Sequence, residues 1–167
     1  FIAIAIKLNS KGPVIFKQER VGKKGRVFKI YKFRSMCVGA EQTGSGVYSG
    51  KGDARVTKVG KILRATSLDE LPQFFNLLKG DMKLVGVRPL SKHYFSLYSP
   101  ELQALRTKVK PGLLPPFYAD MPKTLDEIQA SEMKYLNMCI KRGAFITDII
   151  YMWKIFVNIV FKRARSH

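Results

Sequence analysis

Apolar and polar positions near the start of the chain follow the pattern of a two-stranded hairpin. Residues 14–21 form a largely extended run, residues 22–25 supply glycine-rich turn chemistry, and residues 27–33 form a return run. In the return run, Phe28 and Ile30 alternate with polar neighbours, as expected for a strand with one packed and one solvated face. The pattern predicts a short β-hairpin.

The first six residues are apolar up to the first charge at Lys7. This run is too short to span a bilayer, which needs about 20 apolar residues. It fits either an edge strand or the end of a longer apolar helix. We favour the end of a longer apolar helix, because the run starts abruptly at the first residue. Further along, we expect a mobile glycine-rich loop at 38–51 and a helix around 56–65.

The central segment predicts another helix. Its apolar residues recur at helical spacing and Gly80 is a natural stop, the apolar positions being Leu71, Phe74, Phe75 and Leu78. Ser67 and Glu70 could form a capping box at its start. Alternatively Asp69 is the cap, which places Pro72 comfortably in the first turn. Either way, two adjacent carboxylates lie at a helix N-terminus.

The last apolar segment, residues 144–163, predicts an amphipathic helix. Polar residues recur every three or four positions in one narrow stripe, made of Thr147, Tyr151, Lys154, Asn158 and Lys162, with Asp148 beside it. The remainder is wide and apolar, too interrupted to span a bilayer, and is followed by a basic end at 162–165. An ordinary core helix and a membrane-surface helix explain this pattern equally well, and one helix can do both.

The excess of basic residues indicates an anionic partner. Among 167 residues, 30 are Lys or Arg and 12 are Asp or Glu, for a formal net charge of +18, while 46% are hydrophobic. The chain is therefore too apolar for a disordered basic tail. Its partner could be nucleic acid, an anionic membrane or a phosphorylated substrate. Cys37 and Cys139 lack metal-ligand neighbours, and reduced thiols are expected.

Asp69 and Glu70 are the candidate chemical centre. As cap and dipole partners they would contribute about 1 kcal/mol, which is the plainer interpretation. Alternatively one carboxylate attacks a phosphorus atom while its neighbour helps to hold a divalent cation, which requires basic residues nearby. The chain supplies such residues close in sequence, at Arg55, Lys58, Lys61, Arg64 and Arg88.

Five consecutive blocks resemble the bacterial sugar transferase family, the monotopic phosphoglycosyltransferases. Together they run in the family's order from Gly12 to Pro89, which makes the match specific. The blocks are residues 12–22 (GPVIFKQERVG), 31–36 (YKFRSM), 53–60 (DARVTKVG), 66–73 (TSLDELPQ) and 76–89 (NLLKGDMKLVGVRP).

This resemblance implies an activity. The family's Asp-Glu pair falls on Asp69 and Glu70, so Asp69 would form a covalent phosphosugar intermediate from a UDP-sugar with loss of UMP. Polyprenyl (undecaprenyl) phosphate would then take up the sugar phosphate, initiating assembly of a cell-surface glycan such as an exopolysaccharide, capsule, O-antigen or glycoprotein glycan. Mg²⁺ would serve the pair, with Asp69 and Glu70 as its protein ligands.

The resemblance also implies further site residues. The arginine of the family's Pro-Arg-Pro motif falls on Arg88, which would bind a substrate phosphate, although Val87 replaces the first proline. Arg34 and Arg55 are further phosphate-binding candidates; Arg34 could instead be a solvated or ion-paired strand residue, and Arg55 a solvated loop residue. Glu132 and Tyr135 stand where the family has an Asp and a Tyr near the site.

These arguments predict one α+β domain over residues 1–167, mostly helical and membrane-associated, with a short β-hairpin. The resemblance implies that residues 1–8 are the residual end of an N-terminal membrane helix. It places the domain at the cytoplasmic face of the bacterial inner membrane, with a UDP-sugar, polyprenyl phosphate and an anionic membrane surface as partners. Two other functions would fit parts of the pattern: a basic nucleic-acid-binding module, and a catalytically inactive membrane-surface scaffold. No nucleic-acid-binding signature is recognisable, and the intact Asp69, Glu70 and Arg88 argue against the scaffold.

Overall fold

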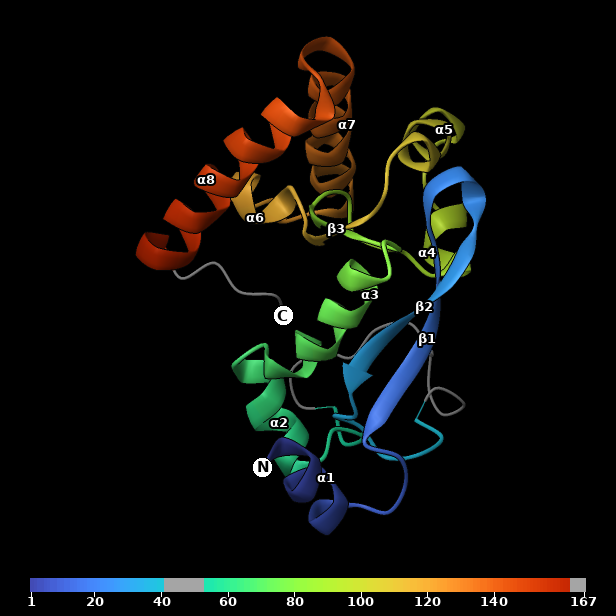
Figure 1. Ribbon diagram of the computed structural model, residues 1–167, viewed down its shortest axis with the longest axis vertical. Helices are drawn as coiled ribbons and strands as arrows, with labels where there is room; N and C mark the ends of the chain where they lie inside the picture. The colour runs from blue at the N-terminus through green and yellow to red at the C-terminus, as the bar shows by residue number, and fades with distance from the viewer. Residues whose placement is uncertain (41–52, 163–167) are drawn as a thin grey trace. The chain divides into compact units, whose positions relative to one another are not determined.

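The structure is a computed structural model that describes residues 1–40 and 53–162 (Figure 1). The described residues form two compact units. One contains Phe1–Lys17 and Tyr31–Phe74, and the other contains Gln18–Ile30 and the chain from Phe75 onward. Most of the expected loop at 38–51, and the basic end at 163–165, lie outside the described residues. The expected single domain over 1–167 stays a prediction, because each unit is described by itself.

The predicted α+β class and the hairpin are confirmed. Strands β1 (Ile15–Val21) and β2 (Val27–Phe33) pair in a two-stranded sheet. They are joined by a single 3₁₀ turn, η1 (Lys23–Gly25), in the expected turn region. Gly25 has a φ of +71°, which a glycine adopts without steric cost. Helices make up most of the remaining described chain.

In the first unit, helix α1 (Ile2–Asn9) packs on helix α2 (Lys58–Ala65) (Figure 1). Ile6 and Leu63 are the large apolar side chains buried there, and the Asn9 side chain accepts a hydrogen bond from the Val59 amide at 3.3 Å. The N-terminal apolar run is therefore a helix and not an edge strand. Thr57 caps α2 by accepting a hydrogen bond from the Gly60 amide.

The segment that carries the two carboxylates begins differently from the expectation. A 3₁₀ helix, η2 (Leu68–Gln73), leads directly into the short helix α3 (Phe74–Leu78). Ser67 precedes η2 in the left-handed conformation, with φ +57°, and its side chain makes no cap hydrogen bond. The predicted Ser67–Glu70 capping box is therefore wrong, because a capping serine needs an extended backbone. Pro72 is accommodated inside the 3₁₀ helix.

The second unit surrounds a two-stranded parallel sheet of β3 (Lys83–Val85) and β4 (Gly112–Leu114). Besides most of α3, the described part of this unit contains helices α4 (Lys92–Ser96), α5 (Pro100–Lys108), α6 (Phe117–Asp120), α7 (Leu125–Arg142) and α8 (Ala144–Lys162). Helices α7 and α8 are joined at Gly143, and α6 packs against both (Figure 1). Their core is built from Val85, Val87, Leu90, Tyr98, Leu102, Tyr135, Leu136, Tyr151 and Ile155.

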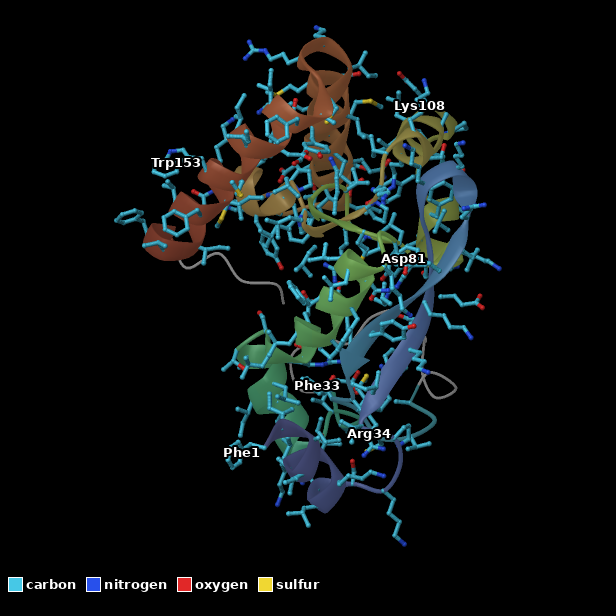
Figure 2. The ribbon with its side chains drawn as sticks, viewed as in Figure 1. Phe1, Phe33, Arg34, Asp81, Lys108 and Trp153 are labelled. Carbon is cyan, nitrogen blue, oxygen red and sulfur yellow. The ribbon has the colours of Figure 1, made fainter. Side chains whose placement is uncertain are left out.

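Helix α8 buries much of its polar stripe, with Lys154 exposed, and it exposes much of its apolar surface. Thr147, Tyr151 and Asn158 are at most 6% exposed, whereas Trp153 is 67% exposed and points away from the other helices of its unit (Figure 2). The other exposed apolar residues of this face are Phe145, Ile146, Ile149, Met152, Phe156, Ile159, Val160 and Phe161. The sequence analysis judged this segment too interrupted to span a bilayer, but residues Ala144–Phe161 are long and apolar enough to cross a membrane on length and composition alone. The wide apolar face of the predicted helix is therefore largely outside the core.

Gly60 allows α2 to approach the segment that follows β2 in the chain. A Cβ atom at this position would lie 1.9 Å from the Ser35 carbonyl oxygen, so a side chain cannot fit without a backbone shift. The Ser35 carbonyl already accepts a hydrogen bond from the Thr57 amide at 3.0 Å. This close approach fixes the helix that leads to Ser67 and the carboxylates.

We expect Gly60→Ala to destabilise the chain by about 1–3 kcal/mol through overpacking, although alanine is the better helix former. Urea unfolding measures the change in the free energy of unfolding. Lys61→Ala, at an exposed position of the same helix, is the matched control and should change stability by less than about 0.5 kcal/mol. A Gly60→Ala variant as stable as the wild type would contradict the close packing of α2.

Candidate active site

Asp69 and Glu70 lie in the first turn of η2, but their environments differ. Asp69 is 8% exposed, although a carboxylate is rarely buried without a partner. Glu70 is partly exposed, and its amide donates a hydrogen bond to the Ser67 carbonyl at 3.2 Å. The left-handed Ser67 costs on the order of 1 kcal/mol of backbone strain, and such strain is often found at functional sites. The two carboxylates are thus presented by a constrained turn.

Lys32 is the cation that the structure adds to this pair. Its ammonium nitrogen lies 2.8 Å from the Glu70 Oε1 atom, and both side chains are 21% exposed. The ion pair joins β2 to η2 across 38 positions of sequence. The sequence analysis missed this residue as a site member. Its only signal was its position inside the YKFRSM block, since no spacing rule connects it to Glu70.

Burial raises the pKa of the Asp69 carboxyl above its ordinary value, and the neighbouring Glu70 charge acts in the same direction. Lys32 and Arg64 oppose this shift by attracting the ionised form. Arg64 also donates a hydrogen bond from Nε to the Ser35 hydroxyl at 2.9 Å. The sequence analysis named Arg64 among the basic residues close to the carboxylates, and the structure brings it within electrostatic reach of Asp69.

Arg34 is held by the end of α1. It is 5% exposed, and its guanidinium donates hydrogen bonds to the Ser10 and Lys11 carbonyls at 2.6 and 2.7 Å (Figure 2). It also donates to the Ser10 hydroxyl at 2.8 Å. These contacts close the C-terminus of α1, a structural role in place of the solvated strand position considered from the sequence. A phosphate role for Arg34 stays a prediction.

Arg55 forms an ion pair with Asp53, with 2.6 Å between Nη2 and Oδ2. A second guanidinium nitrogen donates to the Ala40 carbonyl at 2.8 Å. The guanidinium lowers the pKa of Asp53 to about 2, so this carboxylate stays ionised under all ordinary conditions. Arg55 therefore organises the chain on both sides of residues 41–52, and its phosphate-binding role also stays a prediction.

Arg88 belongs to the second unit. Its side chain is exposed between buried neighbours, with its guanidinium carbon 5.7 Å from the centre of the Phe117 ring. Arg106 forms an ion pair with Glu132, and donates a further hydrogen bond to the Arg88 carbonyl. Through Arg106, Glu132 is thus linked to the backbone of Arg88, and its place near the site stays a prediction.

Tyr135, the other residue singled out with Glu132, belongs to a separate polar cluster. Its hydroxyl donates to Asp148 Oδ1 at 2.5 Å, and Lys83 donates to the same carboxylate at 2.7 Å. Burial raises the pKa of the Tyr135 hydroxyl far above its ordinary value, with the hydrogen bond to Asp148 acting in the same direction. This cluster joins β3, α7 and α8, and holds the tyrosine protonated at physiological pH.

The Asp69 and Glu70 oxygens suit a hard cation that they share with a phosphate group. Mg²⁺ usually takes one or two protein carboxylates and completes its octahedron with water and substrate phosphate oxygens. Within residues 1–40 and 53–162 no group of three or more His, Cys, Asp or Glu side chains is placed to hold a metal alone. Two adjacent carboxylates match the protein share of such a site, and Mg²⁺ as a cofactor stays a prediction.

A family model described as bacterial sugar transferase matches residues 1–162. The chain belongs to the bacterial sugar transferase family. Among similar family members, a UDP-glucose:undecaprenyl-phosphate glucose-1-phosphate transferase from Klebsiella pneumoniae is 54% identical over 114 residues, covering 67% of this chain and 24% of the relative. A UDP-N-acetylgalactosamine-undecaprenyl-phosphate N-acetylgalactosaminephosphotransferase from Aeromonas hydrophila is 51% identical over 113 residues, covering 66% of this chain and 26% of that relative.

A shorter relative covers a larger share of its own length. The putative undecaprenyl-phosphate N-acetylgalactosaminyl 1-phosphate transferase of Bacillus subtilis strain 168 is 44% identical over 110 residues, covering 66% of this chain and 61% of the relative. The present chain spans only about a quarter of the Aeromonas and Klebsiella proteins. These names establish the family kinship that the five sequence blocks predicted.

Asp69→Asn gives a test of the buried carboxylate that needs no substrate. Because the folded-state pKa of Asp69 is raised, its contribution to stability is present below the unfolded pKa, near 3.8, and is lost as pH rises through the folded value. Asparagine cannot ionise and escapes this loss. We therefore expect the melting temperature of Asp69→Asn, relative to wild type, to increase between pH 4 and pH 8. A relative decrease over that range would show that Asp69 is stabilised as an anion.

Proposed function

We propose that this chain carries the catalytic site of a phosphoglycosyltransferase that moves a sugar 1-phosphate from a UDP-sugar to polyprenyl (undecaprenyl) phosphate. The observation that carries the proposal is the buried Asp69 on a strained turn, adjacent to the Glu70–Lys32 ion pair. The printed names of the relatives support the same reaction class. The proposed product is the first lipid-linked sugar of a cell-surface glycan.

Asp69 is the proposed nucleophile. One of its carboxylate oxygens attacks the phosphorus that bears the sugar, the bond from that phosphorus to the UMP oxygen breaks, and UMP leaves with the bonding electrons. The enzyme then holds an aspartyl phosphosugar. A phosphate oxygen of polyprenyl phosphate attacks the same phosphorus, which releases the Asp69 carboxylate and completes the transfer. Splitting the reaction in two lets one carboxylate serve both substrates in turn.

The charges around Asp69 support this role. Attack requires the ionised carboxylate, and burial alone disfavours ionisation, whereas Lys32 and Arg64 favour it. When bound, Mg²⁺ would neutralise charge on the diphosphate, with Asp69 and Glu70 as its protein ligands. The Lys32 ammonium orients Glu70 for this purpose through their 2.8 Å contact. In the proposal Arg88 binds a phosphate group, and Arg34 and Arg55 are secondary candidates for that role.

The exposed side chains around η2 support a lipid substrate. Leu68, Leu71 and Phe74 are 37%, 54% and 60% exposed, although all three are apolar and Asp69 between them is buried. Exposed apolar surface of this kind marks a partner or a membrane. Polyprenyl phosphate keeps its hydrocarbon in the bilayer, so its phosphate is available only at headgroup depth. We place the site at the cytoplasmic face of the bacterial inner membrane, with the net charge of +18 favouring anionic lipid.

The reaction can be followed through the release of UMP and the retention of radiolabelled sugar phosphate on the protein. With Mg²⁺, we expect wild type to release UMP from its UDP-sugar and to carry the label, which polyprenyl phosphate then removes. Asp69→Asn should lose both signals by at least about 1,000-fold, because an amide cannot form the acyl phosphate.

A variant and a chelator test the divalent cation separately from the covalent mechanism. Glu70→Gln and an excess of EDTA should each suppress labelling strongly, because both remove part of the cation site. Turnover by Asp69→Asn comparable to wild type would refute the covalent mechanism. Full activity in EDTA would refute the cation alone. A folded wild type that shows no UMP release from any of a panel of UDP-sugars would favour a scaffold without catalysis.

The apolar face of α8 predicts peripheral binding to anionic vesicles. Trp153 and Phe156 stack with ring centres 6.1 Å apart and are 67% and 55% exposed, so changing both to Ser should leave the fold intact. Vesicle co-sedimentation should weaken at least about ten-fold, given the transfer free energy of two large apolar side chains. The matched control changes two exposed apolar residues of α7, Leu125 and Ile140, to Ser. Equal losses in both variants would contradict a specific role for α8.

A further inference from the structure

The segment around Arg88 has an unusually fixed backbone. From Val87 to Leu90, each of four successive carbonyl groups accepts a hydrogen bond from a different residue. In order along the segment, the donors are the Gly112 amide at 2.9 Å, the Arg106 guanidinium, the Arg20 guanidinium at 3.4 Å and the Val21 amide at 2.9 Å. Val87, Pro89 and Leu90 are buried, whereas the Arg88 side chain is exposed. The chain thus presents one exposed arginine from a locked support.

The donor to Arg88 itself belongs to a buried ion pair. Arg106 bonds Glu132 through Nη1 and the Arg88 carbonyl through Nη2, so one planar guanidinium bridges two acceptors. The side chains of Arg106 and Glu132 are 4% and 0% exposed. The guanidinium also lies over the Tyr98 ring, 5.0 Å from its centre. These contacts fix the plane of the guanidinium and therefore the peptide that follows Arg88.

Stability alone gives a weak reason for this pair. Removing two charges from water costs several kcal/mol per ion, and apolar residues of similar volume often serve a core equally well. Burial raises the pKa of Glu132, while Arg106 and the backbone amide of Arg88 lower it, so Glu132 interacts with both Arg106 and Arg88. A role in fixing the geometry of Arg88 gives a reason for this buried ion pair that packing does not supply.

We infer that Arg106 and Glu132 are positioning residues, which hold the backbone of Arg88 so that its guanidinium is preorganised to bind a nucleoside diphosphate. This inference rests on the proposed function, in which Arg88 binds a phosphate group of the UDP-sugar. The Phe117 ring, 5.7 Å from the Arg88 guanidinium carbon, limits the side chain further. An arginine ordered before binding loses less conformational freedom when it grips phosphate, which strengthens binding.

A double-mutant cycle on UDP binding tests the inference. Isothermal titration of the 167-residue chain with UDP and Mg²⁺ would give Kd for wild type, Arg88→Ala, Arg106→Lys and the double variant. Lysine keeps the charge opposite Glu132 but lacks the planar fork that bridges two acceptors. We expect Arg88→Ala to weaken binding at least about ten-fold and Arg106→Lys about five-fold, in line with lost or misoriented charge-assisted hydrogen bonds.

The decisive quantity is the effect of Arg106→Lys in the Arg88→Ala background. If the pair acts through Arg88, the second substitution should then change Kd by less than about two-fold, which is the usual limit of additivity for independent sites. The same five-fold loss in both backgrounds would overturn the positioning role. If Arg88→Ala binds UDP normally, Arg88 is not the phosphate ligand, and that part of the proposed function fails first.

Two further proteins separate positioning from folding. Leu102→Ala destabilises the same helix, α5, at a core position that is 1% exposed, and should lower the melting temperature without changing Kd for UDP. Should Arg106→Lys fold poorly, the paired change Arg106→Met with Glu132→Leu removes both charges and keeps an apolar fill. We expect this protein to fold. The paired change should weaken UDP binding in the wild-type background but leave it unchanged in the Arg88→Ala background. Undiminished affinity in it would overturn the inference.

Discussion

The need to satisfy carbonyl groups that the helices and strands leave unpaired governs both units of this chain. An unpaired buried backbone group costs about as much as a lost hydrogen bond, so long polar side chains close these groups where no helix or sheet can. Arg34 closes the end of α1, and Asn76 donates to the Lys29 carbonyl at 2.8 Å. Asn158 donates to the Tyr118 and Ala119 carbonyls, at 3.0 and 2.7 Å. Buried polar side chains, more than apolar ones, therefore specify how the short elements connect.

This arrangement explains why so many apolar residues face outward. On α8 most of the polar stripe turns inward, where Thr147 and Asn158 donate hydrogen bonds to backbone carbonyls, and most of the apolar residues remain on the other faces. The same reversal occurs at η2, where Asp69 and Gln73 are buried while Leu71 is exposed. A protein that worked entirely in water would gain by the opposite arrangement. At both α8 and η2, buried polar side chains leave apolar side chains exposed. The same cause therefore accounts for the buried Asp69 and for apolar surface that suits the proposed lipid substrate.

Sequence patterns predicted the elements better than their orientation. Alternation identified the hairpin, and helical spacing identified the helix at 144–162, because both depend on local geometry. The same spacing marked a polar stripe on α8 but could not say that the stripe faces the core. The capping box failed because Ser67 adopts a left-handed backbone that no composition rule reveals. The Lys32–Glu70 pair and the Arg34 contacts join residues distant in sequence, so only the folded chain shows them.

The reversed faces also have a practical consequence for handling the protein. Trp153, Phe156 and Phe161 on α8 can be covered by a detergent micelle as well as by lipid, because neither contact requires specific recognition. When the detergent is diluted below its micellar concentration, these residues become exposed to water. Protein molecules can then cover them only by associating with one another. Concentration, detergent and storage conditions would then control the apparent size of the protein as strongly as any interface encoded in its fold.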